Sequence, residues 1–375
     1  MKSGVLVINF GEPEEATPEA VVPFLERIFL TNAALEGRAP DEAHRTRSRQ
    51  LAGSRAPGLI AEYDRIGGSP LNAQARAQSG ALEGELRRRG LDAACYPVFQ
   101  FLDPFVEEGV RRARQDGVER LVALPVYPLC GHSTTVAALR EVRRAVEAAG
   151  WEVGVLEIAG WHRHPDYLPM HADHVRAFAG ERGVDLSAET TTLLFSVHGT
   201  PLKYLEGGSR YDRYVEESCD VLAGMVGVER YAIGYQNHTN RPIDWTQPDV
   251  EDAVARIEAR DLVVVALSFM HEQSETLAEL DLELRSHAER RGMAFHRVPV
   301  PHDSPRFVAV LADLTEGVLD TGGDHGVEWR RCLCRGGGKA LCTNGMRLDT
   351  VPVSVGTPRR GGARLPQRDA TLPGG

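Results

Sequence analysis

Along most of the chain, short apolar segments alternate with longer segments whose apolar residues recur at helical spacing. Six of the short segments are rich in β-branched and other apolar residues: 4–10, 121–125, 154–158, 192–196, 230–235 and 262–268. They are apolar throughout instead of alternating apolar with polar residues, which is typical of strands buried on both faces. Such strands, separated by helices, predict parallel sheets with helices on both sides. We therefore expect an α/β fold.

The strand–helix pattern restarts about two fifths of the way along the chain, and this predicts two doubly wound, Rossmann-like domains. We expect the first domain over residues 1–149 and the second over residues 150–303. A strongly periodic segment with Pro305 in its first turn predicts a C-terminal helix within residues 304–330. Residues 331–375 contain cysteines and are rich in Gly, Pro and Arg, so we expect a loop and a flexible tail there.

The composition argues against several classes of protein. The chain has 53 acidic and 43 basic residues, a formal net charge of −10, whereas a nucleic-acid-binding domain usually carries a concentrated basic surface. No G-x-G-x-x-G follows the first predicted strand, and the glycines at 336–338 lack the spacing of a phosphate-binding loop, so we expect no nucleotide cofactor. No segment reaches the ~18–20 apolar residues of a membrane-spanning helix. We expect a cytoplasmic protein whose cysteines are free or bind metal, and we leave its oligomeric state and any peripheral membrane contact open.

One motif lies directly at the end of a predicted strand. In LLFSVHGTPLKYLEGGSRY, residues 193–211, an apolar strand ends at Ser196 and is followed by His198 and Gly199. Ligands in open α/β sheets bind outside the carboxyl ends of the strands, which places His198 where a site is expected. Gly199 lets a ligand approach the backbone closely. A histidine that only caps the strand is the alternative.

A second motif, SFMHEQSETLAELDLELRSHAERR at residues 268–291, also joins an apolar strand to a helix. Glu275, Glu279 and Glu283 fall at i, i+4 and i+8 and therefore share one face of this helix. Like charges at this spacing oppose helix formation by ~0.2–0.5 kcal/mol per pair, so the line favours a function such as binding or conducting a cation. The alternative is a solvated acidic face near a helix N-terminus, where the helix dipole stabilises carboxylates. Glu275 lies nearest to the strand end and is the best placed of the three.

Together these segments resemble the ferrochelatases, which insert Fe²⁺ into a porphyrin in haem synthesis. The residues around His198 match the family's S-x-H-G-x-P signature, and residues 268–281 resemble its second motif, in which a glutamate opens an E-x-L-x-E-x-D helix. The likeness is colinear from about residue 4 to residue 320. It includes the N-terminal VLVINFGEPEE, the loop IGGSPLN at 66–72, LPVYPLCGHSTT at 124–135 and GYQN at 234–237.

The resemblance implies a chelatase fold, in which two Rossmann-like domains flank a cleft and a C-terminal helix packs back on the first domain. The porphyrin substrate would bind in that cleft, and protoporphyrin IX and coproporphyrin III are both open as its identity. The resemblance further implies that His198 coordinates the substrate Fe²⁺ or accepts a pyrrole proton, with Glu275 as its partner ligand and base. Glu279 and Glu283 would continue an acidic path away from the site.

The resemblance also assigns residues that flank these motifs. Four residues are candidates to bind the porphyrin. They are Arg27 and Ile28 at the end of the first helix, Ser69 in the IGGSPLN loop and Tyr127 in the mid-chain segment. An ordinary helix end and turn is the alternative. The second motif departs from the family, because Glu272, Gln273 and Ser274 stand where Asp, His and an aliphatic residue are usual. This change would retune the acidity or the metal preference of the site.

Three cysteines, Cys332, Cys334 and Cys342, cluster after the last predicted helix. In a cytosolic chain such a cluster is a candidate for thiolate metal ligands. Some ferrochelatases carry a [2Fe-2S] cluster on three C-terminal cysteines and one mid-chain cysteine, and Cys130 lies in the segment where the distant ligand falls in some members. The resemblance therefore implies a [2Fe-2S] cluster on these four residues. A solvent-exposed cysteine loop and a tail altered by a reading-frame error are the alternatives.

The sequence thus predicts a ferrochelatase, and two alternatives stay open. One is another type-II chelatase, which inserts cobalt or nickel into a sirohydrochlorin-like ring. The colinear SVHGTP, GSPLN and YQN segments weigh against it. The other is a non-catalytic haem- or iron-binding protein that uses the same cleft, and the intact His198 and Glu275 argue against that hypothesis.

Overall fold

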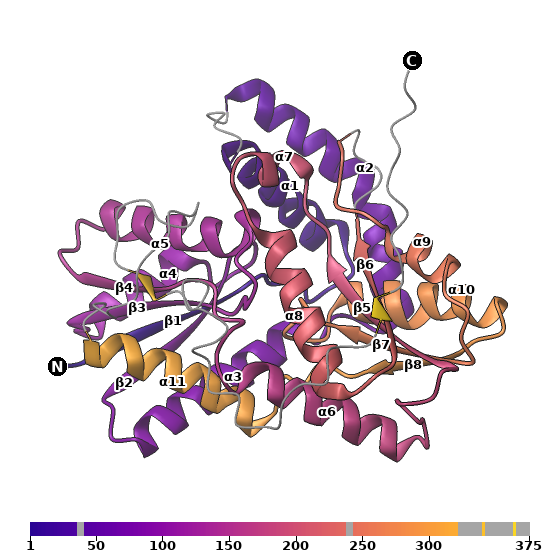
Figure 1. The fold of residues 1–375 in the computed structure, drawn as a ribbon. Helices are drawn as coiled ribbons and strands as arrows, with labels where there is room; N and C mark the ends of the chain where they lie inside the picture. The colour runs from indigo at the N-terminus through magenta and orange to yellow at the C-terminus, as the bar shows by residue number, and fades with distance from the viewer. Residues whose placement is uncertain (36–40, 238–242, 322–339, 342–362, 365–375) are drawn as a thin grey trace.

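The computed structural model describes residues 1–35, 41–237 and 243–321, together with the residue pairs 340–341 and 363–364. Its strands form two parallel sheets (Figure 1). The first sheet contains β1 (Ser3–Asn9), β2 (Ala93–Phe99), β3 (Arg120–Pro125), β4 (Gly154–Ile158) and β9 (Ala340–Leu341). The second sheet contains β5 (Thr191–His198), β6 (Arg230–Gln236), β7 (Asp261–Ala266), β8 (Ala294–Val298) and β10 (Ala363–Arg364).

Both sheets have the same strand order. It is β2-β1-β3-β4 in the first sheet and β6-β5-β7-β8 in the second, with the two-residue strands β9 and β10 at one edge of each. This order, in which the second strand lies outside the first and the third and fourth lie on the other side, is that of a doubly wound fold. The predicted α/β fold with two doubly wound parallel sheets is confirmed.

Helices connect the strands and cover the sheets. They are α1 (Pro18–Leu35), α2 (Glu42–Ile66), α3 (Leu71–Arg88), α4 (Val106–Gln115), η1 (His132–Val136), α5 (Ala137–Ala148), α6 (Tyr167–Glu181), α7 (Leu202–Glu206), α8 (Tyr211–Val226), α9 (Val250–Ala255), η2 (Glu275–Leu284), α10 (Arg285–Arg290) and α11 (Pro305–Thr321). The helices η1 and η2 are π-helices. In the described part of the chain, no helix is both long and apolar enough to cross a membrane.

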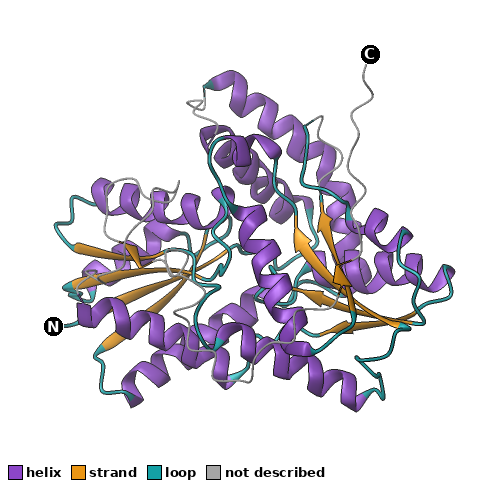
Figure 2. Ribbon diagram, in the orientation of Figure 1, coloured by secondary structure: helices purple, strands orange, loops and turns teal. Residues whose placement is uncertain are grey.

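Side chains of β1 alternate between two apolar layers, which explains why the strand is apolar throughout. Val5 and Val7 pack with α3 and α11 on one face, whereas Leu6 and Ile8 pack with α4 and α5 on the other. All four are fully buried, and burial of each such side chain stabilises the fold by about 1.5–3 kcal/mol. In the second sheet, α6 and α8 cover one face of β5, and α9 and η2 cover the other. Figure 2 shows helices on both sides of each group of strands.

The position of β4 corrects the expected division of the chain. The sequence assigned residues 154–158 to the second domain, but this strand pairs with β3 in the first sheet, where Leu121 lies opposite Val155. The reason is the short β3–α5–β4 connection, because a strand–helix–strand unit returns the chain to a parallel position in the same sheet. The first half of the molecule therefore spans residues 1–158, and we call residues 159–298 the second half.

Most of the expected C-terminal loop and tail lies outside the described residues, but two residue pairs within it form short strands. Ala340–Leu341 pairs with β4, and Ala363–Arg364 pairs with β6, both in parallel. These short strands occupy sheet edges, where backbone N–H and C=O groups otherwise lack partners. The helix α11, which precedes them, packs against α3 and β4 of the first half.

Candidate active site

A cleft with a volume of about 530 Å³ is lined by residues of both halves. Its walls include the segments that follow β1 and β3 in the first sheet and β5 and β7 in the second. In each sheet these two strands are the neighbours at which the direction of winding reverses, and doubly wound folds bind ligands at that point. Helices α1 and α2 supply much of the remaining wall.

His198 is the last residue of β5 and lines the cleft. Its backbone N–H donates to the hydroxyl of Ser268 at 2.8 Å, and the Tyr211 hydroxyl donates to its carbonyl oxygen at 3.0 Å. The ring is fixed as well, because Nδ1 lies 2.6 Å from the carbonyl oxygen of Gly199. A carbonyl oxygen only accepts hydrogen bonds, so Nδ1 carries a proton and Nε2 is the nitrogen left for a metal or for proton exchange.

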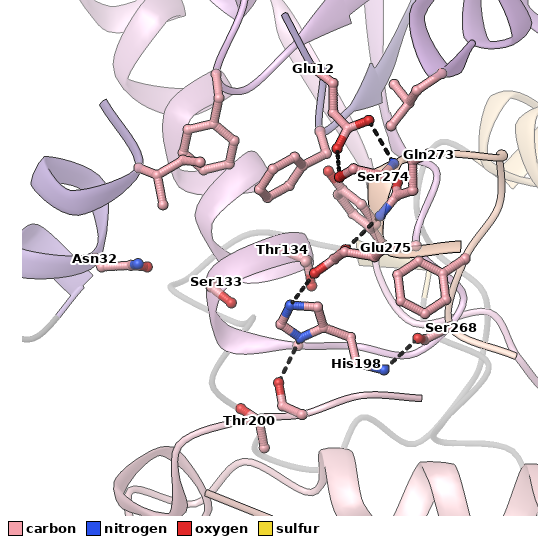
Figure 3. Close-up of a pocket in the computed structure, with 18 of the residues that line it drawn as sticks. Glu12, Asn32, Ser133, Thr134, His198, Thr200, Ser268, Gln273, Ser274 and Glu275 are labelled. Atoms are coloured by element: carbon pink, nitrogen blue, oxygen red, sulfur yellow. Dashed lines mark hydrogen bonds and ion pairs between the residues drawn. The ribbon is translucent and has the colours of Figure 1, made fainter. Parts of the chain in front are cut away.

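Glu275 begins η2 and points toward the His198 ring (Figure 3). Its Oε1 lies 3.3 Å from Nε2 of His198. The other carboxylate oxygen, Oε2, accepts a hydrogen bond from the Gln273 side chain at 2.6 Å. The structure thus brings together the two residues that the sequence singled out from separate motifs. It also gives a role to Gln273, which orients the glutamate from the position where the resemblance placed a histidine.

Gln236, at the end of β6, holds η2 against the second sheet. Its Nε2 donates to Oε2 of Glu279 at 2.8 Å and to the backbone carbonyl of Glu275 at 2.9 Å. Its Oε1 accepts a hydrogen bond from the hydroxyl of Ser196 in β5 at 2.7 Å. The GYQN segment therefore supports both acidic residues that face the cleft.

The acidic line predicted on one helix face divides in the structure. Glu275 and Glu279 line the cleft, whereas Glu283 does not. Glu283 is half exposed and pairs with Arg65 of α2 at 2.8 Å. A further acid comes from α2, because Glu62 lines the cleft and its pKa is raised by burial and by the charge of Glu283. The acidic wall is therefore built from two helices.

Two groups of this wall hold a proton at neutral pH. Burial by itself lowers the pKa of His198, but the Glu275 carboxylate and the hydrogen bond to the Gly199 carbonyl raise it to about 9. Burial, assisted by the negative charge of Glu275, raises the pKa of Glu279 to about 8. Two exchangeable protons thus lie in one cluster of metal-ligating side chains. This composition suits a site that exchanges protons for a cation.

Comparison with known proteins identifies the family. The family model described as Ferrochelatase matches residues 2–318 of the chain. The chain belongs to the ferrochelatase family. The ferrochelatase of Synechococcus sp. (strain RCC307) is 32% identical to it over 328 residues, which are 84% of this chain and 82% of the relative. The ferrochelatase of Parasynechococcus marenigrum (strain WH8102) is 33% identical over 331 residues, 84% of this chain and 83% of the relative. The predicted family membership is confirmed.

A solved structure shares the fold of this ferrochelatase family member. SirB from Bacillus subtilis with Fe³⁺ matches it with a TM-score of 0.52 and 11% sequence identity, covering 87% of this chain and 98% of SirB. At this low identity the likeness concerns the fold alone.

Of the four residues expected to bind a porphyrin in a ferrochelatase, two line the cleft and two do not. Ile28 and Tyr127 line it. The guanidinium of Arg27 instead pairs with Glu141 at 2.9 Å, outside the cleft lining. Ser69 accepts a hydrogen bond at the start of α3. Neighbouring residues of a helix point in different directions, so the cleft receives Ile28 and not Arg27.

The structure adds cleft residues that sequence reasoning missed. Aromatic side chains from several elements line it, among them Phe10, Phe24 and Trp245. Arg55 of α2 also lines the cleft and makes no ion pair with any residue that the structure describes. Burial lowers the pKa of Arg55, against the opposing effect of Glu62. The sequence gives no signal for Arg55, because α2 contains several arginines at unremarkable positions.

The predicted ligands of an iron–sulfur cluster can be followed only in part. Cys332, Cys334 and Cys342 lie outside the described residues. Cys130 follows β3 as a buried free thiol that packs in the apolar layer under α4 and α5. The [2Fe-2S] cluster stays a prediction for this ferrochelatase family member.

Another set of metal-ligating side chains lies away from the cleft. One ligand atom each from His164, Asp166 and Asp313 lie within 4.8 Å of one another. The guanidinium of Arg89 lies 2.6 Å from Asp313, so a cation already neutralises this group. These side chains join α3, the start of α6 and α11, and we assign them a structural role.

Proposed function

We propose that this member of the ferrochelatase family inserts Fe²⁺ into a porphyrin within the cleft, as a step of haem synthesis. The observation that carries the proposal is the pairing of His198 and Glu275, with Nε2 and Oε1 3.3 Å apart, on one wall of a cleft that is otherwise rich in aromatic side chains. Family membership over residues 2–318 supports the same reaction.

The opposite side of the cleft suits a porphyrin. A porphyrin is a flat apolar macrocycle with carboxylate side chains, so it needs apolar contacts for its faces and cations for its edges. Phe10, Phe24 and Phe29 offer the apolar contacts. Arg55 offers a guanidinium that no described acid pairs, and such a group can bind a propionate in a bidentate manner.

Metallation exchanges two pyrrole protons for one Fe²⁺ ion, and the His198–Glu275 pair fits this exchange. Neutral imidazole and carboxylate are suitable ligands for Fe²⁺, but an imidazolium is not. Because the pKa of His198 is raised to about 9, the ring must lose a proton before Nε2 can hold the metal. Glu275 then remains beside the metal as ligand and as acceptor of pyrrole protons.

Glu279 provides a second proton-exchanging group behind this pair. Its pKa of about 8 keeps it neutral while Glu275 carries charge, and an approaching dication would favour its ionisation. Gln236 fixes its position at 2.8 Å. We infer that Glu279 first releases its own proton toward Glu62 and the exposed end of η2 and then accepts protons displaced from the site.

The test is anaerobic insertion of Fe²⁺ by the purified full chain, with protoporphyrin IX and coproporphyrin III assayed in parallel by their visible spectra. We expect one of the two porphyrins to be metallated faster. Insertion of Co²⁺ or Ni²⁺ into a sirohydrochlorin-like ring, with no iron porphyrin formed, would instead support the other chelatase activity. Tight haem binding without any metallation would support a non-catalytic binding protein.

We further propose that Cys130, Cys332, Cys334 and Cys342 hold a [2Fe-2S] cluster. Three of them are close together in the sequence, and the fourth follows β3 as a free thiol. The protein purified without oxygen is then brown, with a visible charge-transfer spectrum that Cys332→Ser abolishes. A colourless, iron-free preparation of the unaltered chain contradicts the proposal.

A further inference from the structure

Glu12 is a buried carboxyl group that belongs to the first half of the molecule but contacts the second. It follows β1 in the loop that lines the cleft and is 5% exposed. Its Oε2 accepts a hydrogen bond from the backbone N–H of Ser274 at 3.1 Å, and its Oε1 lies 2.5 Å from the hydroxyl of the same serine. Ser274 directly precedes Glu275, and Figure 3 shows both contacts beside the His198–Glu275 pair.

Glu12 is itself held firmly, which a positioning role requires. The backbone N–H of Glu12 donates to Oδ1 of Asn72 at 3.1 Å, and Nδ2 of Asn72 donates to the Glu12 carbonyl at 2.7 Å. Asn72 lies at the start of α3. From the same helix, Gln74 accepts a hydrogen bond from the backbone N–H of Glu272 at 2.9 Å. The first half of the molecule therefore forms hydrogen bonds with two of the three residues before Glu275, namely Glu272 and Ser274.

Hydrogen bonds from outside are needed here because a helix cannot satisfy its own first backbone N–H groups. The first backbone N–H groups of a helix have no partner within it, and an acceptor from outside that satisfies one of them fixes where the helix begins. The side chain of Ser274, the residue before η2, makes no cap, and the hydroxyl of Thr276 accepts only the backbone N–H of Gln273, at 2.9 Å. Glu12 supplies the acceptor from the other half.

We propose that Glu12 is a positioning residue that holds Ser274 through two hydrogen bonds and thereby fixes Glu275 opposite His198. This inference deepens the function proposed above and rests on it. The hold does not depend on the charge of Glu12. The Ser274 N–H needs only one acceptor oxygen, and the serine hydroxyl can either donate to a carboxylate or accept from a carboxylic acid.

Because the proposed role depends only on geometry, a glutamine at this position should keep the function of Glu12, whereas an alanine should not. Glutamine keeps one acceptor oxygen for the Ser274 N–H and an amide that can donate to the hydroxyl. Residues that orient a metal ligand typically contribute about 10–100-fold in metal affinity or activity, and one that acts through the neighbouring residue belongs at the lower end. We therefore expect about a tenfold loss in Glu12→Ala and less than about a twofold loss in Glu12→Gln.

The first experiment measures Co²⁺ binding from its visible absorption bands in the full chain, with His198→Ala as the reference that lacks the site. Glu12→Ala is expected to weaken Co²⁺ binding about tenfold, and Glu12→Gln to restore it. Glu15→Ala is the matched control, because Glu15 lies in the same loop, is exposed and is outside the cleft lining. The double variant Glu12→Ala, Ser274→Ala should bind no more weakly than Glu12→Ala alone, since both changes break the same contact.

The second experiment measures iron insertion by the same variants. Glu12→Ala should lower kcat by a similar factor and leave the KM for the porphyrin unchanged, because Glu12 acts on the metal side of the cleft. If Glu12→Ala does not fold, Glu12→Leu fills the same space without an acceptor and replaces it in both experiments. Wild-type Co²⁺ affinity in the alanine or leucine variant overturns the inference, and so does a glutamine variant as impaired as alanine. A wild-type chain that binds Co²⁺ but inserts no iron would overturn the proposed function instead.

Discussion

The two sheets share one strand order, yet equivalent strand ends present different chemistry to the cleft. After β1 and β3, the first half presents Phe10 and Tyr127, and α1 and α2 add further aromatic and apolar side chains. After β5 and β7, the second half presents His198, Ser268 and Glu275. The same topology thus provides an apolar wall that suits a macrocycle and a titratable wall that suits a metal ion. The first half thus supplies most of the apolar lining, whereas the His198–Glu275 pair comes from the second half, with Glu12 and Glu62 of the first half beside it.

The turns that follow β1 and β5 each require a glycine, but for different reasons. Gly11 has a φ of +83°, and a Cβ there would lie 2.8 Å from Phe99, so the first turn needs a left-handed backbone. Gly199 has no such φ, but a Cβ there would lie 1.8 Å from Oδ1 of Asn237. Its N–H donates to the Gln236 carbonyl at 2.8 Å. The second turn therefore needs a close approach between strand ends, which keeps His198 next to the support of η2.

The largest effect is expected from removing the titratable wall. His198→Ala or Glu275→Gln should lower kcat for iron insertion by about 10²–10⁴-fold, because each removes a metal ligand and a proton acceptor. Porphyrin affinity, measured from the shift of the porphyrin absorption band, should hardly change. Glu289→Gln, an exposed acid of α10 outside the cleft, is the control. Unchanged rates of iron insertion in both cleft variants would contradict the assignment of the metal chemistry to the second half.

A smaller effect, on porphyrin affinity and not on kcat, is expected from a substitution in the first half. Arg55→Gln should raise the porphyrin Kd by about tenfold, since a hydrogen bond to a charged group contributes about 1.5–3 kcal/mol. The kcat at saturating porphyrin should stay close to wild type, because Arg55 is assigned to recognition. Arg49→Gln serves as the control on the same helix, where Arg49 is exposed and lies 3.4 Å from Glu26. A loss in kcat with an unchanged Kd would contradict this division.

The third expected effect is a pH dependence confined to the metal wall. His198 has its pKa raised to about 9, so below pH 9 a proton occupies the ring and competes with the metal. Apparent Co²⁺ affinity should therefore rise about tenfold per pH unit between pH 8 and pH 9 and level off above that, and it should rise more steeply below pH 8, where Glu279 also releases a proton. Porphyrin affinity should not follow this slope, because the Arg55 guanidinium keeps its charge over that range. Co²⁺ affinity that is flat from pH 7 to pH 9 would contradict the assignment of His198.

The site residues that could be predicted from the sequence are those whose position depends on a single local segment. His198 could be predicted because an apolar strand ends beside it, and Glu275 because it stands where another strand gives way to a helix. The π-helical winding of η2 could not, since residues four apart share a face in the expected α-helix and the sequence carries no mark of a wider turn. As a result Glu283 was grouped with residues that it does not accompany into the cleft.

What the sequence could not reveal depends on contacts between distant segments. Arg55 and Trp245 reach the cleft because α2 and the loop after β6 close over it, and neither has a local signature. Glu12 was read only as part of an N-terminal segment, and its role appears when Ser274 is placed beside it. The strand β4 was assigned to the wrong sheet, because an apolar run indicates a buried strand and not its neighbour.

Within residues 1–321 the described chain passes from one half to the other near residues 159–166 and 299–304, and the helices next to these two segments contact each other. Arg306 pairs with Asp173 at 2.6 Å, and Nε2 of His174 lies 2.8 Å from the carbonyl oxygen of Pro299. A movement that separates the two halves would break the contacts of Glu12 with Ser274. For the proposed function, we therefore expect the release of a rigid metallated ring to depend on these buried hydrogen bonds as well as on the chemistry of the metal.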